Sequence, residues 1–258
     1  MRIQVGVPGG DEAVRICAWL GLRAPALIAL SASSPYWEGV DSGYCSARNN
    51  IVGVFQASGV MPASLRSRHD VARHVARLAQ RGLAAGTGEV DWDVRPALRH
   101  NVVEMRALDT PLHPSYAAAL ACYARELCIE AAERPGAWPR WSTREVYQWN
   151  RFNACRRGVL GDWIDPCSRK KYPIEQVVRD DLARLVVRSN DPDFLNACVL
   201  IHELLHNGGQ ARWLTARMAA DAGPGDLARR AGEMFARSPA QGSKGESCRD
   251  SRRRQVND

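Results

Sequence analysis

Two stretches near the middle of the chain decide the predicted fold, Trp92-Asp-Val-Arg-Pro96 and Val102-Val-Glu-Met-Arg-Ala-Leu-Asp-Thr-Pro111. Both are typical of strands with charges on one face, since every second side chain of an extended backbone points the same way. Asp93 and Arg95 would share a face, as would Glu104 and Arg106. A site for ATP and magnesium needs such carboxylates and guanidinium groups on rigid strands. The alternative, cross-strand ion pairs on a solvated face, remains open on the pattern alone.

A third strand is predicted at the start of the chain, where Ile3, Val5 and Val7 alternate with polar or small residues. Its polar face, which includes Gln4, would join the charged face of the other two strands. Helical periodicity dominates most of the remaining chain, at residues 67–81, 115–132, 143–156, 173–188, 192–206, 209–221 and 225–236. This order predicts an α+β fold in which helices cover one face of an antiparallel sheet.

The boundaries of other elements follow from local signals. After the first strand, one helix is predicted to open at Asp11 and stop at Gly21, and a second to start at Pro25. Residues 36–62 have little periodicity and predict a long, ordered, function-bearing loop. The sequence Ser142-Thr-Arg-Glu145 is typical of a capping box at a helix start.

Length and composition bound the domain organisation. With 258 residues and 45% hydrophobic content, the chain can bury one sizeable core. We expect a single domain over residues 1–237 and a basic, disordered tail over residues 238–258, which holds Arg252-Arg-Arg254. The net charge of +7 is compatible with nucleic-acid binding. The sequence nevertheless lacks zinc-finger, RNP and recognition-helix motifs, so no nucleic-acid partner is expected.

The sequence also predicts a cytoplasmic protein that does not engage a membrane. The first residues are typical of a short strand rather than a signal peptide, and the longest apolar run, residues 24–32, is far below the roughly 20 residues that cross a bilayer. The 8 cysteines include no Cys-x-x-Cys pair, so neither a zinc site nor a disulfide framework is indicated. Four of them are expected to fill space in the core, namely Cys17, Cys122, Cys128 and Cys198.

Four blocks of residues carry a resemblance to a known family. The first is Ala29-Leu-Ser-Ala-Ser-Ser-Pro-Tyr-Trp-Glu-Gly-Val-Asp-Ser-Gly43, followed by Ser46 and Arg48. The second and third are Trp92-Asp-Val-Arg-Pro96 and Val103-Glu-Met-Arg-Ala-Leu-Asp-Thr-Pro-Leu112. The fourth is Asn150-Arg-Phe-Asn-Ala-Cys-Arg156 with Gly158, then Asp165-Pro166. In this order, over residues 1–170, the blocks resemble the carboxylate-amine ligases called glutamate-cysteine ligase type 2.

The resemblance implies a glutamine-synthetase-like catalytic fold, incomplete at its N-terminus, with ATP and Mg²⁺ as cofactors. The substrates would be amino acids, with glutamate joined weakly to cysteine or to another amine through an acyl phosphate. Glu104 would bind the metal, and the nucleotide would contact Gln4, Asp93 and Arg95. The catalytic residues would be Arg106 and Arg156, and the substrate-binding residues Asp41, Arg48 and Arg151.

The chain also departs from the family pattern. Its first residue stands inside what is an interior strand in family members, so the Glu-rich segment that normally precedes it is missing. Arg2 and Gln4 fall where many members have a His-x-His pair, Arg157 replaces an aromatic residue and Leu160 an acidic one. We therefore expect either a shortened start or carboxylates supplied by another chain. The alternative function is a catalytically silent subunit that depends on a partner chain or a homo-oligomer.

Some residues have plain structural alternatives. Asp109 before Thr110-Pro111 would then only turn the chain, and Asn150 and Arg151 would be contacts between helix and sheet.

A rival motif lies on a later helix. His202-Glu-Leu-Leu-His206 satisfies the His-Glu-x-x-His pattern of zinc hydrolases, in which two histidines one turn apart bind zinc. Arg212 occupies the third histidine position of the metzincin extension, and Glu233, at a loose spacing, is the one downstream helical carboxylate considered as a third ligand. An apolar stripe through Phe194 and Ile201 explains the helix as ordinary packing. Zinc hydrolysis is kept as a remote alternative.

Overall fold

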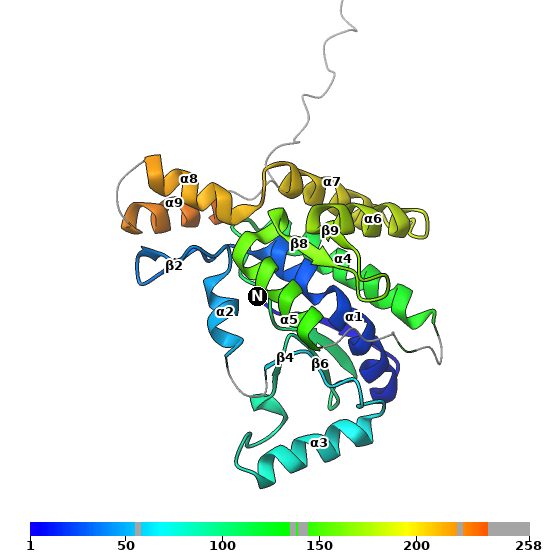
Figure 1. Cartoon of the computed structure of the whole chain (residues 1–258). Helices are drawn as coiled ribbons and strands as arrows, with labels where there is room; N and C mark the ends of the chain where they lie inside the picture. The colour runs from blue at the N-terminus through cyan, green and yellow to red at the C-terminus, as the bar shows by residue number, and fades with distance from the viewer. Residues whose placement is uncertain (55–57, 135–137, 139–143, 221–223, 237–258) are drawn as a thin grey trace, which may run out of the picture.

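The computed structural model describes residues 1–54, 58–134, 138, 144–220 and 224–236 (Figure 1). Its order of elements is a strand, helices, a strand pair and a helical C-terminal half, and this mixture of helices with a main antiparallel sheet is compatible with the predicted α+β fold. The predicted basic tail and the residues Ser142 and Thr143 of the predicted capping box lie outside the described residues.

A three-stranded antiparallel sheet has the order β1 (Ile3–Gly6), β7 (Val102–Met105), β6 (Val94–Ala97). The first and third predicted strands and the second half of the middle one therefore share one sheet, whereas Trp92 lies in a separate short strand, β5 (Asp91–Trp92). Pairing places Ile3 opposite Met105 and Met105 opposite Val94, and these three buried residues belong to the main core. The alternate row on the other face holds Gln4, Glu104 and Arg95. Pro96 is tolerated because β6 pairs only with β7 among the described strands, and a proline costs least at a sheet edge.

Helix α1 (Gly10–Ser31) is the centre of the molecule, with the sheet on one side and further helices on the other (Figure 1). It packs against β6 and β7 and also against α4 (Pro114–Ala132) and α5 (Arg144–Arg157). Because neighbours surround it, α1 is buried along nearly its whole length. Among the described residues, α1 is also the helix long and apolar enough to cross a membrane, but 83% of its most apolar window is buried inside the protein.

The prediction that this region forms two helices was wrong. One helix runs through Gly21 and contains Pro25. Proline at 25 removes the backbone hydrogen bond that the carbonyl of Gly21 would accept, which costs an isolated helix about 3 kcal/mol. Burial of apolar side chains on both sides of this point, including Leu20, Leu27 and Leu30, outweighs that local cost.

The remaining predicted helices are confirmed to within a few residues, and their starts have clear local causes. Ser67 accepts the amide hydrogen of Asp70 at the start of α3, and Asp191 does the same for Asp193 at α7. Helices α4 and α7 each have a proline in the first turn, where no amide donor is needed. Besides α1, α4 and α5, the helices are α2 (Ala47–Val52), α3 (Arg68–Gln80), α6 (Ile174–Val186), α7 (Pro192–His206), α8 (Gln210–Ala220) and α9 (Pro224–Ala236).

Short strand pairs stand apart from the main sheet. They are β2 (Tyr36–Trp37) with β3 (Val40–Asp41), β4 (Ser58–Gly59) with β5 (Asp91–Trp92), and β8 (Asp162–Ile164) with β9 (Lys171–Pro173). The predicted long loop over residues 36–62 therefore contains β2, β3, α2 and β4. Two one-turn 3-10 helices, η1 (Thr87–Glu89) and η2 (Gly158–Leu160), complete the described elements.

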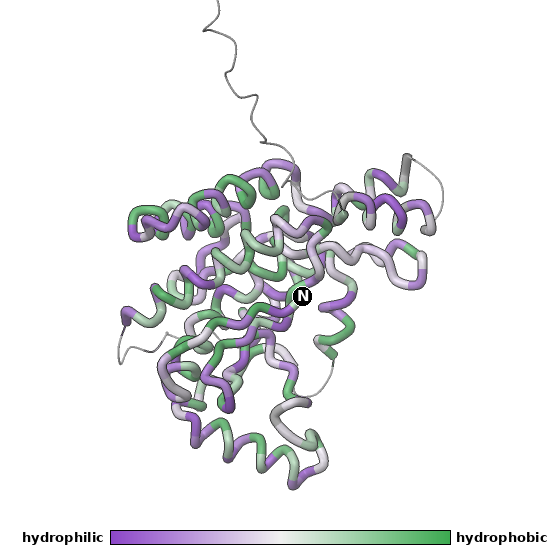
Figure 2. Tube along the Cα trace, turned by 180° about the vertical axis from the view of Figure 1, so that it is seen from behind, coloured by the Kyte–Doolittle hydropathy of each residue, from purple (hydrophilic) through white to green (hydrophobic). Residues whose placement is uncertain are grey.

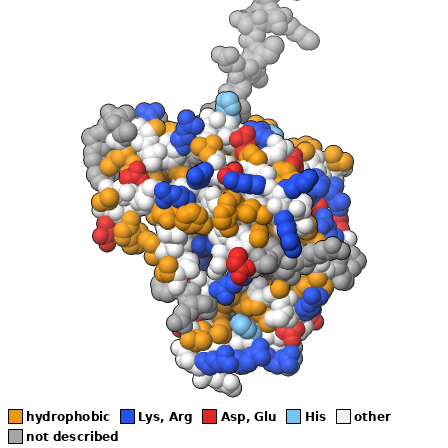
Figure 3. Space-filling view, viewed as in Figure 1, with side chains coloured by type: hydrophobic (Ala, Val, Ile, Leu, Met, Phe, Trp, Pro, Cys, Tyr) orange, Lys and Arg blue, Asp and Glu red, His pale blue; other side chains and the backbone are white. Residues whose placement is uncertain are grey.

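Hydropathy along the backbone matches these layers. The central helices include long hydrophobic stretches, whereas hydrophobic and hydrophilic residues alternate along α3 at the lower end (Figure 2). Helix α3 buries only Val71 and Val75, and its arginines give the lower rim a band of basic side chains (Figure 3). Of the four cysteines expected in the core, Cys17 and Cys128 are buried, while Cys122 and Cys198 are half-buried at its edge.

Candidate active site

A row of three polar side chains crosses the sheet on the face opposite the core residues of its strands. Gln4 of β1 lies opposite Glu104 of β7, which lies opposite Arg95 of β6. Arg95 Nε donates to Glu104 Oε2 at 2.6 Å, and Arg2 Nη1 lies 3.7 Å from Glu104 Oε1. Glu104 is only 2% exposed, because these guanidinium groups cover it. The sequence prediction that Gln4, Arg95 and Glu104 come together is confirmed.

Arg106 joins the same row through a shared acceptor. Its Nη1 donates to the carbonyl of Val90 at 3.2 Å, and Nη1 of Arg95 donates to the same oxygen at 3.4 Å. Arg106 also lies 3.0 Å from a carboxylate oxygen of Asp91. The pKa of Arg106 is lowered, first because partial burial disfavours its charge and then because Arg95 repels it. The structure therefore holds Arg95 and Arg106 against each other.

This sheet face, defined by Arg2, Gln4, Arg95, Glu104 and Arg106, carries an excess of positive charge. Three guanidinium groups meet two carboxylates, those of Glu104 and Asp91. Guanidinium groups that repel one another on a strand are suited to a polyanion, because phosphate oxygens would relieve the repulsion.

The donors present fit a nucleotide polyphosphate better than a metal held by protein alone. In the part of the chain that the structure describes, no three His, Cys, Asp or Glu side chains come together as a metal site. Magnesium is commonly held by one or two carboxylates together with substrate phosphates. Glu104 and the amide oxygen of Gln4 fit that incomplete set, provided that Glu104 releases Arg95.

Asp93 does not share the face of Arg95, which corrects the sequence prediction. Its carboxylate accepts hydrogen bonds from Tyr147 Oη at 2.6 Å and from Arg151 Nε at 2.8 Å, both on α5. The chain bends at Asp93 between β5 and β6, so the alternation of strand side chains is broken there. Asp93 and Arg151 are 4% and 8% exposed, and the structural alternative for Arg151, a contact between helix and sheet, is the one observed.

Burial and charge both act on this cluster. Burial and the Asp93 carboxylate raise the pKa of Tyr147 well above its usual value, so the phenol stays protonated and donates. Burial alone would lower the pKa of Arg151, but Asp93 raises it further than burial lowers it. Gly53 is required beside the pair, since a Cβ there would lie 2.5 Å from Nη1 of Arg151.

A second buried carboxylate, Asp109, organises the loop after α1. It accepts from Ser34 Oγ at 2.7 Å, from the backbone amide of Ser33 at 3.1 Å and from Asn49 Nδ2 at 3.3 Å. Nη1 of Arg48 lies 3.7 Å away and remains about half exposed. Asp109 therefore does more than turn the chain. Sequence reasoning missed Ser33, Ser34 and Asn49, although the first two lie in the first resembling block.

The two remaining predicted residues, Asp41 and Arg156, meet at a different place, the turn over residues 41–45. Asp41 Oδ1 accepts the amide hydrogen of Gly43 at 2.8 Å. The Arg156 guanidinium lies over the ring of Tyr44 at 5.2 Å, and its carbonyl accepts from the amide of Cys45. Both side chains are exposed, and among the described residues neither is bonded to Arg95, Glu104 or Arg106.

Short contacts nevertheless connect all four resembling blocks. Nη2 of Arg151 donates to the carbonyl of Asn49 at 2.9 Å, and Asn49 in turn binds Asp109. The contacts thus run from Asp93 through Arg151 and Asn49 to Asp109. Asp109 in turn binds the loop that holds Ser33 and Ser34, here called the serine loop. Residues separated by 58 to 102 positions meet in this chain of contacts. It gives the blocks a physical reason to occur together.

The His202-Glu-Leu-Leu-His206 helix shows no hydrolase geometry. Both histidines are exposed, and Glu203 Oε1 accepts from Tyr116 Oη at 3.3 Å instead of facing an open metal position. Glu233, the carboxylate considered as a further ligand, pairs with Arg229 on its own helix. The zinc alternative is therefore unsupported by any described cluster of ligands.

Comparison with known proteins agrees with this arrangement. Residues 1–246 match the family model described as glutamate-cysteine ligase family 2 (GCS2). The chain therefore belongs to this family of carboxylate-amine ligases.

Three similar curated proteins carry the name "Putative glutamate--cysteine ligase 2". The relative from Methylibium petroleiphilum is 36% identical over 219 residues, which is 85% of this chain and 59% of that protein. The relative from Bordetella parapertussis is 37% identical over 215 residues, which is 83% of this chain and 51% of that protein. The relative from Nitrosospira multiformis is 31% identical over 234 residues, which is 91% of this chain and 63% of that protein. The chain thus spans little more than half the length of the first of these relatives.

Proposed function

We propose that this chain carries the phosphate-binding face of an ATP-dependent ligase that joins an amino-acid carboxylate to an amine, with glutamate and cysteine as the first pair to test. The observation that supports it most directly is the row Gln4, Glu104 and Arg95, with Arg106 beside it. Membership in the ligase family supports the reaction class. The glutamine-synthetase-like fold and a cytoplasmic location remain predictions.

The chemistry explains why such a face is needed. A carboxylate and an amine do not condense in neutral water, since hydroxide is a poor leaving group. Phosphorylation of the carboxylate gives an acyl phosphate whose leaving group is phosphate, and attack by the neutral amine then forms the amide. Catalysis of phosphoryl transfer consists mainly of positioning and of neutralising charge on the transferred group.

The residues divide this work between them. Arg95 and Arg106 would bind phosphate oxygens, because their mutual repulsion falls when an anion enters. Glu104 with Gln4 would hold Mg²⁺, which supplies further neutralisation of the phosphates when bound. Arg48, whose Nη1 is held by Asn49 and lies near Asp109 while the side chain stays about half exposed, is the candidate for the substrate carboxylate.

The test is ADP release by the purified protein with glutamate and a panel of amines, beside nucleotide binding measured without turnover. Where the reading frame extends upstream of Met1, the longer chain is assayed in parallel. Glutamate-dependent ADP release is the expected result. A folded protein that binds ATP but releases no ADP would indicate the partner-dependent subunit, and one that neither binds nor hydrolyses ATP would contradict the proposal.

A further inference from the structure

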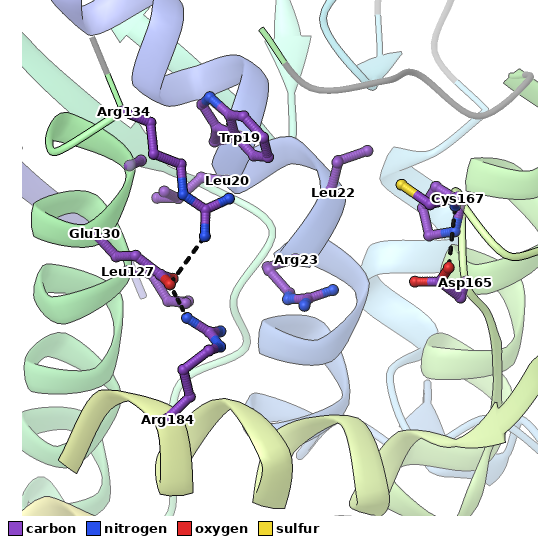
Figure 4. A pocket seen from close by; sticks show the side chains of 12 residues that line it. Trp19, Leu20, Leu22, Arg23, Leu127, Glu130, Arg134, Asp165, Cys167 and Arg184 are labelled. Carbon is purple, nitrogen blue, oxygen red and sulfur yellow. Dashed lines mark hydrogen bonds and ion pairs between the residues drawn. The ribbon is translucent and has the colours of Figure 1, made fainter. Parts of the chain in front are cut away.

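A cavity of about 190 Å³ lies between α1, α4, α6 and the turn after β8, and the proposed ligase function does not use it. Figure 4 shows its side chains converging from three directions: Glu130, Arg134 and Arg184 on one side, Asp165 and Cys167 on the other, and Arg23 between them. Pockets for drug-sized ligands are larger, about 300–1,000 Å³. This volume suits a molecule the size of a single amino acid.

One side of the cavity offers donors to an anion. Nε of Arg23 lies 2.9 Å from Asp181, and its two terminal nitrogens make no hydrogen bond to any other described residue. Arg134 and Arg184 share the oxygen Oε1 of Glu130, and Arg184 also shares Asp181 with Arg23, so three guanidinium groups on this wall meet two carboxylates. A carboxylate placed beside Arg23 would complete its hydrogen bonds.

The opposite side offers an acceptor to a cation. Oδ1 of Asp165 accepts the amide hydrogens of Cys167 at 3.1 Å and of Ser168 at 2.6 Å, and the Ser168 hydroxyl also bonds this carboxylate. Burial raises the pKa of Asp165, but the Ser168 amide and hydroxyl and the Cys167 amide lower it further, so the group is ionised at neutral pH. An ammonium group beside this carboxylate would gain a charge-assisted contact.

Between the charged sides the wall is apolar. Leu20 and Leu127 line it, together with the ring of Trp19, on which the Arg134 guanidinium lies at 4.7 Å from the centroid. Arg23 is near enough to Asp165 to lower the pKa of its carboxyl, so two opposite charges stand close together beside this apolar wall, as the ammonium and carboxylate of an α-amino acid require. We propose that this cavity binds a free α-amino acid with an apolar side chain, at a site separate from the sheet face.

The first experiment tests the chemistry of the ligand by calorimetric titration of the whole chain with L-leucine. N-acetyl-L-leucine lacks the ammonium group and isopentylamine lacks the carboxylate. Each analogue should bind at least about tenfold more weakly, since each loses one charge-assisted contact. Equal binding of either analogue, or no saturable binding of leucine, would overturn the proposal.

The second experiment tests the place. Cys167→Trp fills the cavity mouth from an exposed turn and should abolish leucine binding without loss of fold, checked by circular dichroism. Arg23→Gln should weaken binding at least about tenfold, whereas the matched control Arg179→Gln, on the outer face of α6, should leave it unchanged.

A third measurement separates this site from the ligase site. Leucine should protect Cys167 from alkylation, followed by mass spectrometry of its peptide, and Arg106→Gln should bind leucine as the natural chain does. Binding that survives Cys167→Trp but is lost in Arg106→Gln would place the amino acid on the sheet face and overturn the separate site. Loss of ATP binding in Arg106→Gln concerns only the proposed ligase function.

Discussion

Two arginine–carboxylate pairs at neighbouring positions of one chain segment differ in what they leave available. Asp93 and Arg151 are both buried, and Tyr147 and the carbonyl of Asn49 complete their hydrogen bonds. Arg95 and Glu104 are joined equally closely, but further guanidinium groups stand beside them and repel one another. The pair of Asp93 and Arg151 holds α5 to the sheet region. The pair of Arg95 and Glu104 has other charged groups beside it, so on our proposal either member would bind a ligand in place of its present partner. A charged residue predicted from the sequence is thus a candidate for ligand binding only where neighbouring residues of opposite charge do not neutralise it fully.

The largest effect is expected when the buried pair loses one member. Arg151→Met leaves the Asp93 carboxylate buried without its cation, which should lower the free energy of unfolding by about 3–5 kcal/mol in urea denaturation. Arg179→Met, which breaks the surface pair with Glu175, should cost less than about 0.5 kcal/mol. A loss for Arg151→Met as small as that of the surface control would show that the pair is not structural.

The next effect concerns the exchangeable pair and appears in turnover. Glu104→Gln keeps the shape of the side chain and its hydrogen bond from Arg95 but removes the charge that Mg²⁺ requires. ADP release should fall at least about 100-fold, equivalent to about 2.7 kcal/mol, while the free energy of unfolding changes by about 1 kcal/mol or less. Unchanged ADP release by this variant would remove Glu104 from the proposed site.

A smaller effect should follow from crowding Arg151. Gly53→Ala places a methyl group 2.5 Å from Nη1 and should cost about 2 kcal/mol of stability as the guanidinium moves. In the double variant with Arg151→Met the added methyl meets no guanidinium, so the two losses should not add. Additive losses would mean that Gly53 acts through backbone freedom alone.

The smallest effect is expected on the rival motif. His202→Ala and His206→Ala alter exposed side chains, so each should change stability by less than about 0.5 kcal/mol and leave ADP release intact. Metal analysis of the purified protein serves as the second readout. Stoichiometric zinc that disappears with activity in His202→Ala would reverse the choice between ligase and hydrolase.

Local signals in the sequence predict much of this fold. Capping by Ser67 and Asp191, prolines in first turns and strand alternation locate the helices and the central sheet. Prediction fails where distant contacts decide the outcome. Gly21 and Pro25 favour a break that burial overrides, and the bend at Asp93 shows no local signature. The short strands β8 and β9 were not predicted because three residues carry little periodicity.

The candidate site divides in the same way. Strand register brings Gln4, Glu104 and Arg95 together, and alternation alone predicts that. The hydrogen bond from Ser34 to Asp109 joins residues 75 positions apart in the chain, so no local sequence pattern predicts it.

Helix α1 joins two distant parts of the molecule mechanically. Near its middle Trp19 and Arg23 border the cavity, and at its end Ser31 Oγ accepts the amide hydrogen of Asp109. Arg23 and Ser31 are about 12 Å apart along the axis at 1.5 Å per residue. Pro25 lies between them, and a helix bends most easily where proline has removed a hydrogen bond. A bend of α1 at Pro25 would therefore shift the serine loop, which holds Ser33 and Ser34, relative to the cavity.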